Sequence, residues 1–291
     1  MSVKRVILIA AVLGVFCAAG AGFQVKPRTC YEATFRARVA KGPNLDDSPQ
    51  LVDVMPACVS RAAILGVKFC AVQWKFLDAN GKVVPRPHEG ASPQTLFFRE
   101  WRPYRYRFWT PEDAVRFELF PMHGTKGNKA EIADVAVREV PDAERGVLNC
   151  NGDFSAADDI PWGWQLIGSS LFHNVASGRS TVNTMDAHLN GDLFPVTPGT
   201  SVKVEAVCSD PVFFASRRDY TDVRICFYSS YGEASERGKT SRGRFAEPAV
   251  SPKGRSAKAS HVYRVPAGRH WARVSVWHGI AEKIEVTEVK E

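Results

Sequence analysis

Aromatic and arginine side chains at every second position are the features of this sequence best suited to bind a ligand. They stand in short segments that alternate polar with apolar residues, a pattern typical of strands buried on one face. An aromatic ring stacks on the apolar face of a sugar ring, and arginine donates hydrogen bonds to its hydroxyls. The residues that we predict to contact a ligand are Trp277, Arg273, Tyr228, Arg224, Trp162, Trp164, Trp74 and Arg116.

Each of these residues also has a structural interpretation. Large aromatic side chains are mostly buried, so Trp74 and Trp277 would then be covered by a loop or by the other half of the chain. Trp162 and Trp164, which flank a glycine, would plug the end of a sandwich instead of lining a binding loop. The arginines would lie on a solvated sheet face.

Known catalytic motifs are absent from the sequence. We find no nucleophile elbow, paired-histidine zinc motif, phosphate loop, dinucleotide fingerprint or Cys-x-x-Cys pair. The adjacent acids Asp46-Asp47 and Asp158-Asp159 fall in expected loops, whereas a glycosidase needs two carboxyls set across a cleft about 5–9.5 Å apart. We therefore expect a protein that is not an enzyme, with a divergent polysaccharide-active enzyme as the weaker alternative.

The charge balance argues against a dedicated nucleic-acid binder. The chain has 38 Lys and Arg against 31 Asp and Glu, a formal net charge of +7 over 291 residues, which is a mild excess. A basic segment rich in Ser and Gly runs from Arg237 to Lys258, and we expect it to be a loop. It would either capture an anionic polysaccharide or remain a solvated loop.

The N-terminus has the order of a secretory signal peptide. Lys4 and Arg5 precede an apolar run from Val6 to Val15, and small residues follow it. No later apolar run reaches the roughly 18 residues that a membrane span needs. We predict that residues 1–22 are removed and that the mature protein, without a transmembrane span, is secreted, periplasmic or on the cell surface.

The rest of the chain reads as a diverged tandem repeat. Val25-Lys26-Pro27-Arg28-Thr29 and Val196-Thr197-Pro198-Gly199-Thr200 share the pattern V-x-P-x-T before an alternating segment. Further segments correspond in the same order: 67–70 with 223–226, 110–111 with 265–266, 114–120 with 271–277, 123–124 with 278–279, and 135–140 with 284–289. Ordered matches indicate duplication, so we predict one domain at 23–141, which lacks an opening strand, and another at 142–291.

Both halves are predicted to be all-β, as two tandem antiparallel jelly-roll β-sandwiches. Neither half has a long helical pattern, and Gly, Pro, Asn and Asp separate the short alternating segments. The core positions expected from the alternation are Val67, Phe69, Ala71, Val115, Phe117, Leu119, Val223, Ile225, Phe227, Ala272, Val274 and Val276. The predicted ligand-binding residues on these strands would lie on the opposite faces.

The cysteines are compatible with disulfides in an exported chain. Removal of the signal peptide leaves Cys30, Cys58, Cys70, Cys150, Cys208 and Cys226, and an even number permits complete pairing. We favour one disulfide in each half, Cys30–Cys58 and Cys150–Cys208, but the sequence leaves the other pairings open.

The second half carries the landmarks of a known group of domains. Asn151-Gly152-Asp153-Phe154, followed by Pro161-Trp162-Gly163-Trp164-Gln165, resembles the opening strand of galactose-binding-like jelly-roll domains. Residues 194–200 and 265–268 resemble later landmarks of carbohydrate-binding modules of the family 4 and 9 kind. The resemblance covers most of residues 148–291, with a truncated, diverged copy in 25–141. It implies a sugar-binding module, a cell-surface module or a structural spacer.

The resemblance also implies a structural calcium ion near the first and last strands. Asp153 and Asp134 are the possible ligands, whereas Lys283 occupies the position of the second half that matches Asp134. No other cofactor is expected. We predict a secreted non-catalytic protein that binds carbohydrate, with an envelope structural or protein-interaction protein as the alternative.

Overall fold

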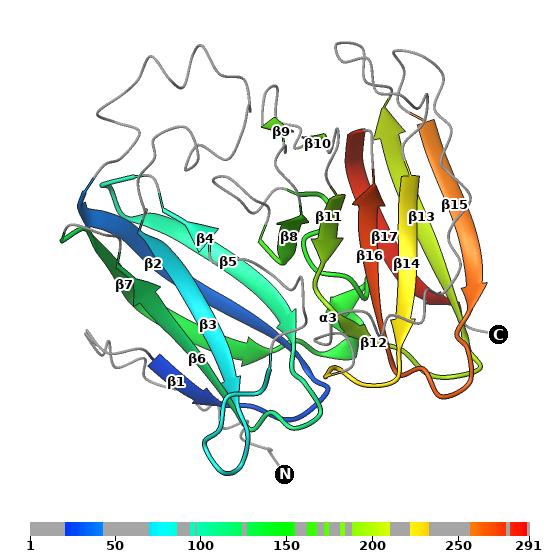
Figure 1. Ribbon diagram of the computed structural model, residues 1–291, viewed down its shortest axis with the longest axis horizontal. Coiled ribbons are helices and arrows are strands. Elements are labelled where there is room, and N and C mark those ends of the chain that lie inside the picture. The colour runs from blue at the N-terminus through cyan, green and yellow to red at the C-terminus, as the bar shows by residue number, and fades with distance from the viewer. Residues whose placement is uncertain are drawn as a thin grey trace, which may run out of the picture.

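The computed structural model contains two β-sandwiches that lie side by side (Figure 1). It describes residues 21–42, 70–85, 94–96, 98–123, 127–154, 162–167, 172–174, 181–183, 188–209, 222–232, 257–277 and 280–289. The predicted all-β class is confirmed, because strands form nearly all of the secondary structure and their pairings are antiparallel. The signal-peptide prediction falls outside these residues, except that Ala21 and Gly22 begin the first strand.

The first sandwich is made of a four-stranded sheet and a three-stranded sheet. Their orders are β1-β6-β3-β4 and β5-β2-β7. The strands are β1 (Ala21–Gln24), β2 (Cys30–Lys41), β3 (Ala71–Leu77), β4 (Gln94–Thr95), β5 (Arg102–Trp109), β6 (Arg116–Met122) and β7 (Lys129–Glu139). In β2, Phe35 and Ala37 are buried while Thr34 and Arg36 are exposed, so one face of this sheet covers the core and the other faces solvent.

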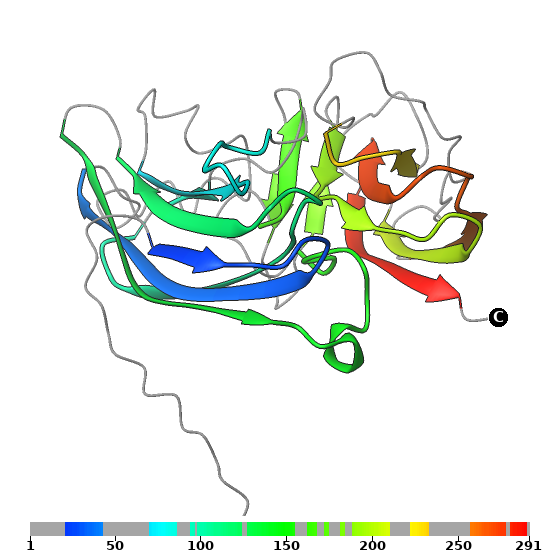
Figure 2. The ribbon, with the colours of Figure 1, turned by 90° about the horizontal axis from the view of Figure 1, so that it is seen from below.

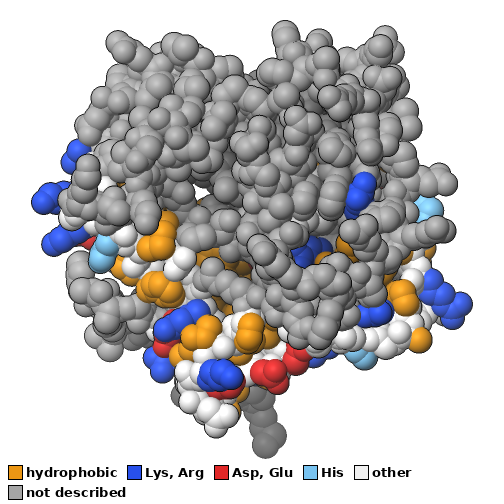
Figure 3. Space-filling model, viewed as in Figure 1, with side chains coloured by type: hydrophobic (Ala, Val, Ile, Leu, Met, Phe, Trp, Pro, Cys, Tyr) orange, Lys and Arg blue, Asp and Glu red, His pale blue; other side chains and the backbone are white. Residues whose placement is uncertain are grey.

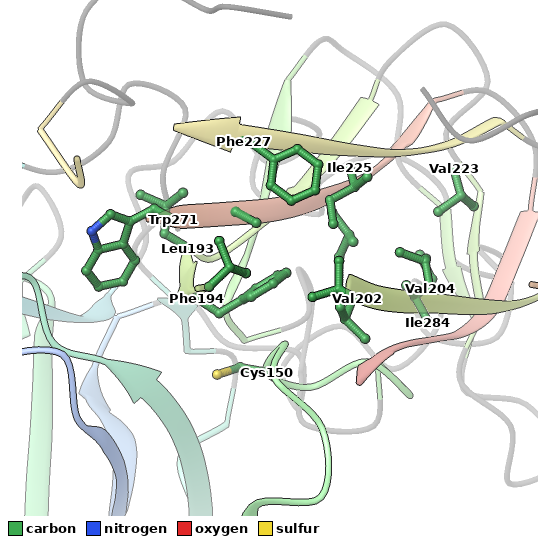
Figure 4. Close-up of a cluster of buried hydrophobic side chains, with 14 of the residues drawn as sticks. Cys150, Leu193, Phe194, Val202, Val204, Val223, Ile225, Phe227, Trp271 and Ile284 are labelled. Carbon is green, nitrogen blue, oxygen red and sulfur yellow. The ribbon is translucent and has the colours of Figure 1, made fainter. Parts of the chain in front are cut away.

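The second sandwich has a sheet of order β15-β13-β17-β10-β9 and a sheet of order β12-β16-β11-β8, in which β14 also pairs with β16. The strands are β8 (Trp164–Ile167), β9 (Phe172–Asn174), β10 (Thr181–Asn183), β11 (His188–Gly191), β12 (Phe194–Pro195), β13 (Ser201–Ser209), β14 (Asp222–Tyr228), β15 (Ala257–Arg264), β16 (Trp271–Trp277) and β17 (Ile280–Val289). Figure 4 shows Val202, Ile225 and Phe227 from facing strands meeting in its core.

A short connection joins the sandwiches at their lower edge. It leaves β7, forms the helix α3 (Asp142–Arg145) and then enters the second sandwich (Figure 2). Among the described residues, no helix is long and apolar enough to cross a membrane.

The two sandwiches repeat the same strand pairings. β2 lies between β5 and β7 as β13 lies between β15 and β17, and β6 pairs with β1 and β3 as β16 pairs with β12 and β14. The V-x-P-x-T turns also make equivalent hydrogen bonds, from Arg28 N to Thr110 O and from Gly199 N to Val265 O, both at 3.0 Å. This shared backbone supports the duplication, and the domain limits 23–141 and 142–291 stay a prediction.

The predicted phase of β3 is wrong. Alternation placed Ala71 in the core and Trp74 on the opposite face, but Val72, Trp74 and Phe76 point into the core and Lys75 does not. Both Ala71 and Val72 are buried, so the alternation is ambiguous where the strand begins. Val67 and Phe69 lie outside the described residues.

The hydrogen bonds beside β3 and β14 correct two matches of the predicted repeat. Leu77 O accepts a hydrogen bond from Val115 N at 2.9 Å, and Tyr228 O accepts one from His270 N at 2.8 Å. Leu77 therefore corresponds to Tyr228 and Val115 to His270. The match of 67–70 with 223–226 is wrong, and the match of 114–120 with 271–277 is displaced by two residues. The other predicted core residues that are buried are Phe117, Leu119, Val223, Ile225, Phe227, Ala272, Val274 and Val276.

The described cysteines are not in disulfides. Cys30, Cys70, Cys150 and Cys208 are buried and Cys226 is half-buried. The predicted Cys150–Cys208 disulfide is therefore wrong, and Cys58, the predicted partner of Cys30, lies outside the described residues. Burial raises the pKa of Cys30 to about 11 and that of Cys208 to about 12, so both thiols stay protonated at neutral pH.

Candidate ligand-binding site between the sandwiches

A Trp-Gly-Trp segment ties the two sandwiches together. Trp162 is 1% exposed and packs in the first core, with its ring centroid 5.3 Å from Phe35 and 6.0 Å from Trp74. Trp164 is buried in the second core, 5.0 Å from the ring of Phe154. Gly163 between them has φ +79°, a conformation that favours glycine. The junction is therefore packed from both sides.

The segment before this junction is fixed along β17. The side chain of Asn149 donates to Ile284 O at 2.8 Å and accepts from Val286 N at 2.7 Å, as a strand neighbour would. Ile284 N donates to Gly152 O at 2.7 Å. A Cβ on Gly152 would lie 1.9 Å from Ile284 O, so only glycine fits there. This segment forms a rigid wall.

An open cavity of about 360 Å³ lies between β5 of the first sandwich and β17 of the second. Its lining is Arg105, Arg107, Val147, Asn149, Asn151, Gly152, Asp153, Lys283 and Glu285. Hydrogen-bonding side chains predominate, and the volume is in the range of small-molecule sites. We call it the inter-sandwich cavity.

Glu32 holds the two arginines of the inter-sandwich cavity in place. Its carboxylate is 4% exposed and accepts hydrogen bonds from Arg105 Nε, from Arg107 Nε at 3.0 Å and from Arg138 Nε at 3.1 Å. Burial by itself raises the pKa of Glu32, but the hydrogen bonds from Arg105 and Arg107 outweigh it and lower that pKa overall. Glu32 is therefore ionised at neutral pH and fixes the guanidinium groups.

Trp101 lies at the other end of the same sheet face. Arg36 and Arg38 stack on its ring at 5.5 and 4.7 Å from the centroid, and Asp134 and Glu131 hold these two arginines by ion pairs. Alternation along β5 puts Trp101, Pro103, Arg105 and Arg107 on one face, roughly 13 Å from the first to the third of them. We call this surface the β5 face.

Four of the predicted ligand-binding residues come together on β14 and β16. Arg224 pairs with Ser275, Tyr228 with Trp271, Arg273 with Cys226, and Trp277 with Asp222. This confirms that they share one face of the sheet. Arg273 and Tyr228 are each only 3% exposed, with the guanidinium 5.3 Å from the tyrosine ring, and burial raises the pKa of Tyr228 to about 12. The side chain of Trp277 is outside the described part of the structure, and the ligand role of all four stays a prediction.

The remaining predicted residues do not join that group. Trp74, Trp162 and Trp164 are buried in the two cores, and Trp74 packs within its own sandwich, 6.0 Å from the ring of Trp162. Arg116 is exposed on β6, where it pairs with Glu118 at 3.2 Å. It lies on the sheet opposite β5.

The described residues do not fit the calcium site that the resemblance implied. Asp134 has φ +54° and is paired with Arg36, so a cation already occupies its carboxylate. Asp153 lines the inter-sandwich cavity. Within the described ranges, no group of three or more His, Cys, Asp or Glu residues could hold a metal ion.

The sequence analysis missed Trp101, Arg105 and Arg107. The signal that could have found these three residues lies in 101–109, where aromatic and basic side chains alternate as in a strand with one apolar face.

On the face shown in Figure 3, described basic and acidic side chains are interspersed, and no patch of one sign stands out among them.

Comparison with known proteins shows no family for this chain. No protein-family profile matches it, and no curated protein does. Solved structures similar to it include the CBM22-1-CBM22-2 tandem domain of Xyn10C from Paenibacillus barcinonensis (13% identity, TM-score 0.33, 93% of this chain and 83% of that chain). The ANX2 ectodomain from Arabidopsis thaliana has 8% identity and a TM-score of 0.28, covering 94% and 81%. The tandem CBM51 modules of Sp3GH98 from Streptococcus pneumoniae have 10% identity and a TM-score of 0.23, covering 91% and 80%.

Proposed function

We propose that this protein is an exported, non-catalytic carbohydrate-binding protein whose ligand lies along the β5 face. The observation that carries the proposal is that Trp101 and the cavity arginines Arg105 and Arg107 share this face. A saccharide offers apolar ring faces and hydroxyl groups, and an aromatic platform beside a polar recess matches both. The resemblance of residues 148–291 to carbohydrate-binding modules of the family 4 and 9 kind supports the same class of ligand.

The alternative of an assembly or protein-interaction protein predicts an exposed apolar patch. Among the described residues, the large hydrophobic side chains that are exposed are Val83 on the first sandwich and Val262 on the second. Two single side chains on different sandwiches do not make a patch, so the described surface favours a saccharide.

The cavity also favours binding over hydrolysis. Asp153 and Glu285 are both in its lining, but Lys283 pairs with Glu285 at 2.8 Å. A glycosidase needs two carboxyl groups free to act from opposite sides of the scissile bond, and Lys283 already binds the carboxylate of Glu285. We therefore propose that the protein binds the saccharide without cleaving it.

A glycan array with residues 23–291 tests this function. The wild-type chain is compared with Trp101→Ala, and with Trp277→Ala and Arg116→Gln as variants of two residues chosen from the sequence. Selective binding that is lost only in Trp101→Ala supports the β5 face. Loss only in Trp277→Ala would move the site to β16, and absence of binding to any glycan by the wild-type chain would overturn the proposed function.

A further inference from the structure

We propose that the inter-sandwich cavity binds the acidic group of an anionic saccharide, a carboxylate or a sulfate ester on a sugar ring. This inference rests on the proposed function and adds the chemical class of the ligand. It concerns the cavity end of the β5 face, where Arg105, Arg107 and Lys283 meet.

Arg105 and Arg107 present available hydrogen-bond donors to the cavity. Each binds Glu32 through Nε, and the structure shows neither of them bonded to another described residue. A guanidinium also carries donors on its two terminal nitrogens. Two such forks side by side suit the oxygens of a carboxylate or a sulfate.

The charges around Glu32 favour an anion on this wall. Three arginines surround its single carboxylate, and only Arg138 has a second acidic partner, Glu144 at 2.8 Å. The wall formed by Arg105 and Arg107 therefore keeps a positive excess. Because the pKa of Glu32 is lowered, its carboxylate stays ionised near neutral pH and keeps its hydrogen bonds to the arginines.

The opposite wall suits the hydroxyl groups of the same sugar. Asp153 and Glu285 supply carboxylate acceptors, and Lys283 beside Glu285 supplies a further cation. The hydrogen bonds of Asn149 and the close contact of Gly152 with β17 hold this wall in place. A preformed site loses little conformational entropy when a ligand binds.

Titration calorimetry with three oligosaccharides of equal length tests the inference. The probes are an oligogalacturonate, a sulfated galacto-oligosaccharide and the neutral galacto-oligosaccharide. We expect an acidic probe to bind at least about tenfold more tightly than the neutral one, since a charge-assisted hydrogen bond gives roughly that factor. Whichever acidic probe binds more tightly identifies the acidic group, and added salt reduces its advantage.

Arg105→Gln and Arg138→Gln form a matched pair of variants. Each removes one of the three arginines from Glu32, but only Arg105 lines the cavity. We expect Arg105→Gln to lose about tenfold in affinity for the acidic probe and Arg138→Gln to bind it as the wild-type chain does.

Equal losses in the two variants would overturn the inference, because they would trace to Glu32 and not to the cavity. Equal affinity of the wild-type chain for neutral and acidic probes would overturn the inference and leave the proposed function standing. Absence of binding to all three probes, with selective binding on the glycan array, would also overturn the inference alone.

Discussion

Trp162 and Trp164 are separated by one residue, yet their side chains belong to different hydrophobic cores. Asn151 contacts both residues. Its side-chain Nδ2 donates to the backbone oxygen of Trp162 at 2.9 Å, and its backbone oxygen accepts from Trp164 Nε1 at 3.0 Å. The second core in turn contains Cys30, Trp109 and Val140 from the first half. Each half of the chain thus completes the core of the other.

Trp162→Ala tests this exchange of side chains. We expect a loss of about 3–5 kcal/mol in the free energy of unfolding, because a fully buried ring is replaced by a cavity. Guanidinium denaturation followed by tryptophan fluorescence and circular dichroism measures it. Trp101→Ala, at a partly exposed ring, is the control and should change little. If residues 23–141 alone unfold cooperatively with the midpoint of the intact chain, the first sandwich does not depend on Trp162.

Gly152→Ala tests the wall along β17. The new Cβ would lie 1.9 Å from Ile284 O, so the segment must move and we expect a loss of about 3 kcal/mol. Gly232→Ala is the matched control, because its Cβ would meet only Ser230 Oγ at 3.9 Å. Thermal unfolding of the two variants measures the difference. Equal melting temperatures would show that the segment adapts freely.

Tyr106→Phe tests a hydrogen bond between the sandwiches. The hydroxyl of Tyr106 donates to Asp192, and burial followed by the charge of Asp192 raises the pKa of Tyr106 well above its usual value. The hydroxyl therefore stays protonated, and its removal should cost about 1–3 kcal/mol. A double-mutant cycle with Asp192→Asn isolates the coupling. A coupling energy near zero would contradict the contact.

Glu32→Gln tests the charge arrangement of the first sandwich. The folded-state pKa of Glu32 is lowered. Its contribution to the free energy of unfolding is therefore complete above the unfolded-state pKa of about 4.3, and it is lost as the pH falls through the folded-state pKa. At neutral pH the variant should lose about 2 kcal/mol of unfolding free energy, since the buried amide cannot replace the charge-assisted hydrogen bonds that the carboxylate accepts from three partly exposed arginines. Melting temperatures from neutral to strongly acidic pH should converge for the two proteins. Parallel curves would assign the acid sensitivity to other groups.

The sequence predicted the fold class because alternation and turn residues are local signals. The equivalent hydrogen bonds at Arg28 and Gly199 bear out the V-x-P-x-T match. The phase of β3 failed at Ala71 and Val72, which are both buried, since alternation cannot choose a face where both neighbours are covered. Segment 67–70 was misaligned by five residues, an odd number, so the predicted match and the predicted face of β3 failed together.

The candidate site was harder to predict than the fold. The residues on β14 and β16 were assigned to one face correctly, because neighbouring strands share a face at fixed spacing. Burial of Arg273 depends on residues distant in the sequence, so alternation carried no information about it. The cavity is lined by Arg105 from one half and Lys283 from the other. A local sequence motif cannot predict that residues so distant in the sequence line the same cavity.

The turn at Arg28 differs in function from the equivalent turn at Gly199 in the other half. Arg28 has φ +50° where the equivalent Gly199 has φ +83°, and a left-handed conformation costs a residue with a Cβ about 1–2 kcal/mol. Its guanidinium reaches the other half, where it lies 5.2 Å from the Trp271 ring and donates to His270 O at 3.3 Å. The second half therefore supplies the ring and the carbonyl oxygen that the arginine of the first half contacts. The contact runs one way only, because Gly199 has no side chain with which to reach back, so two turns with matching backbones have different roles in the junction.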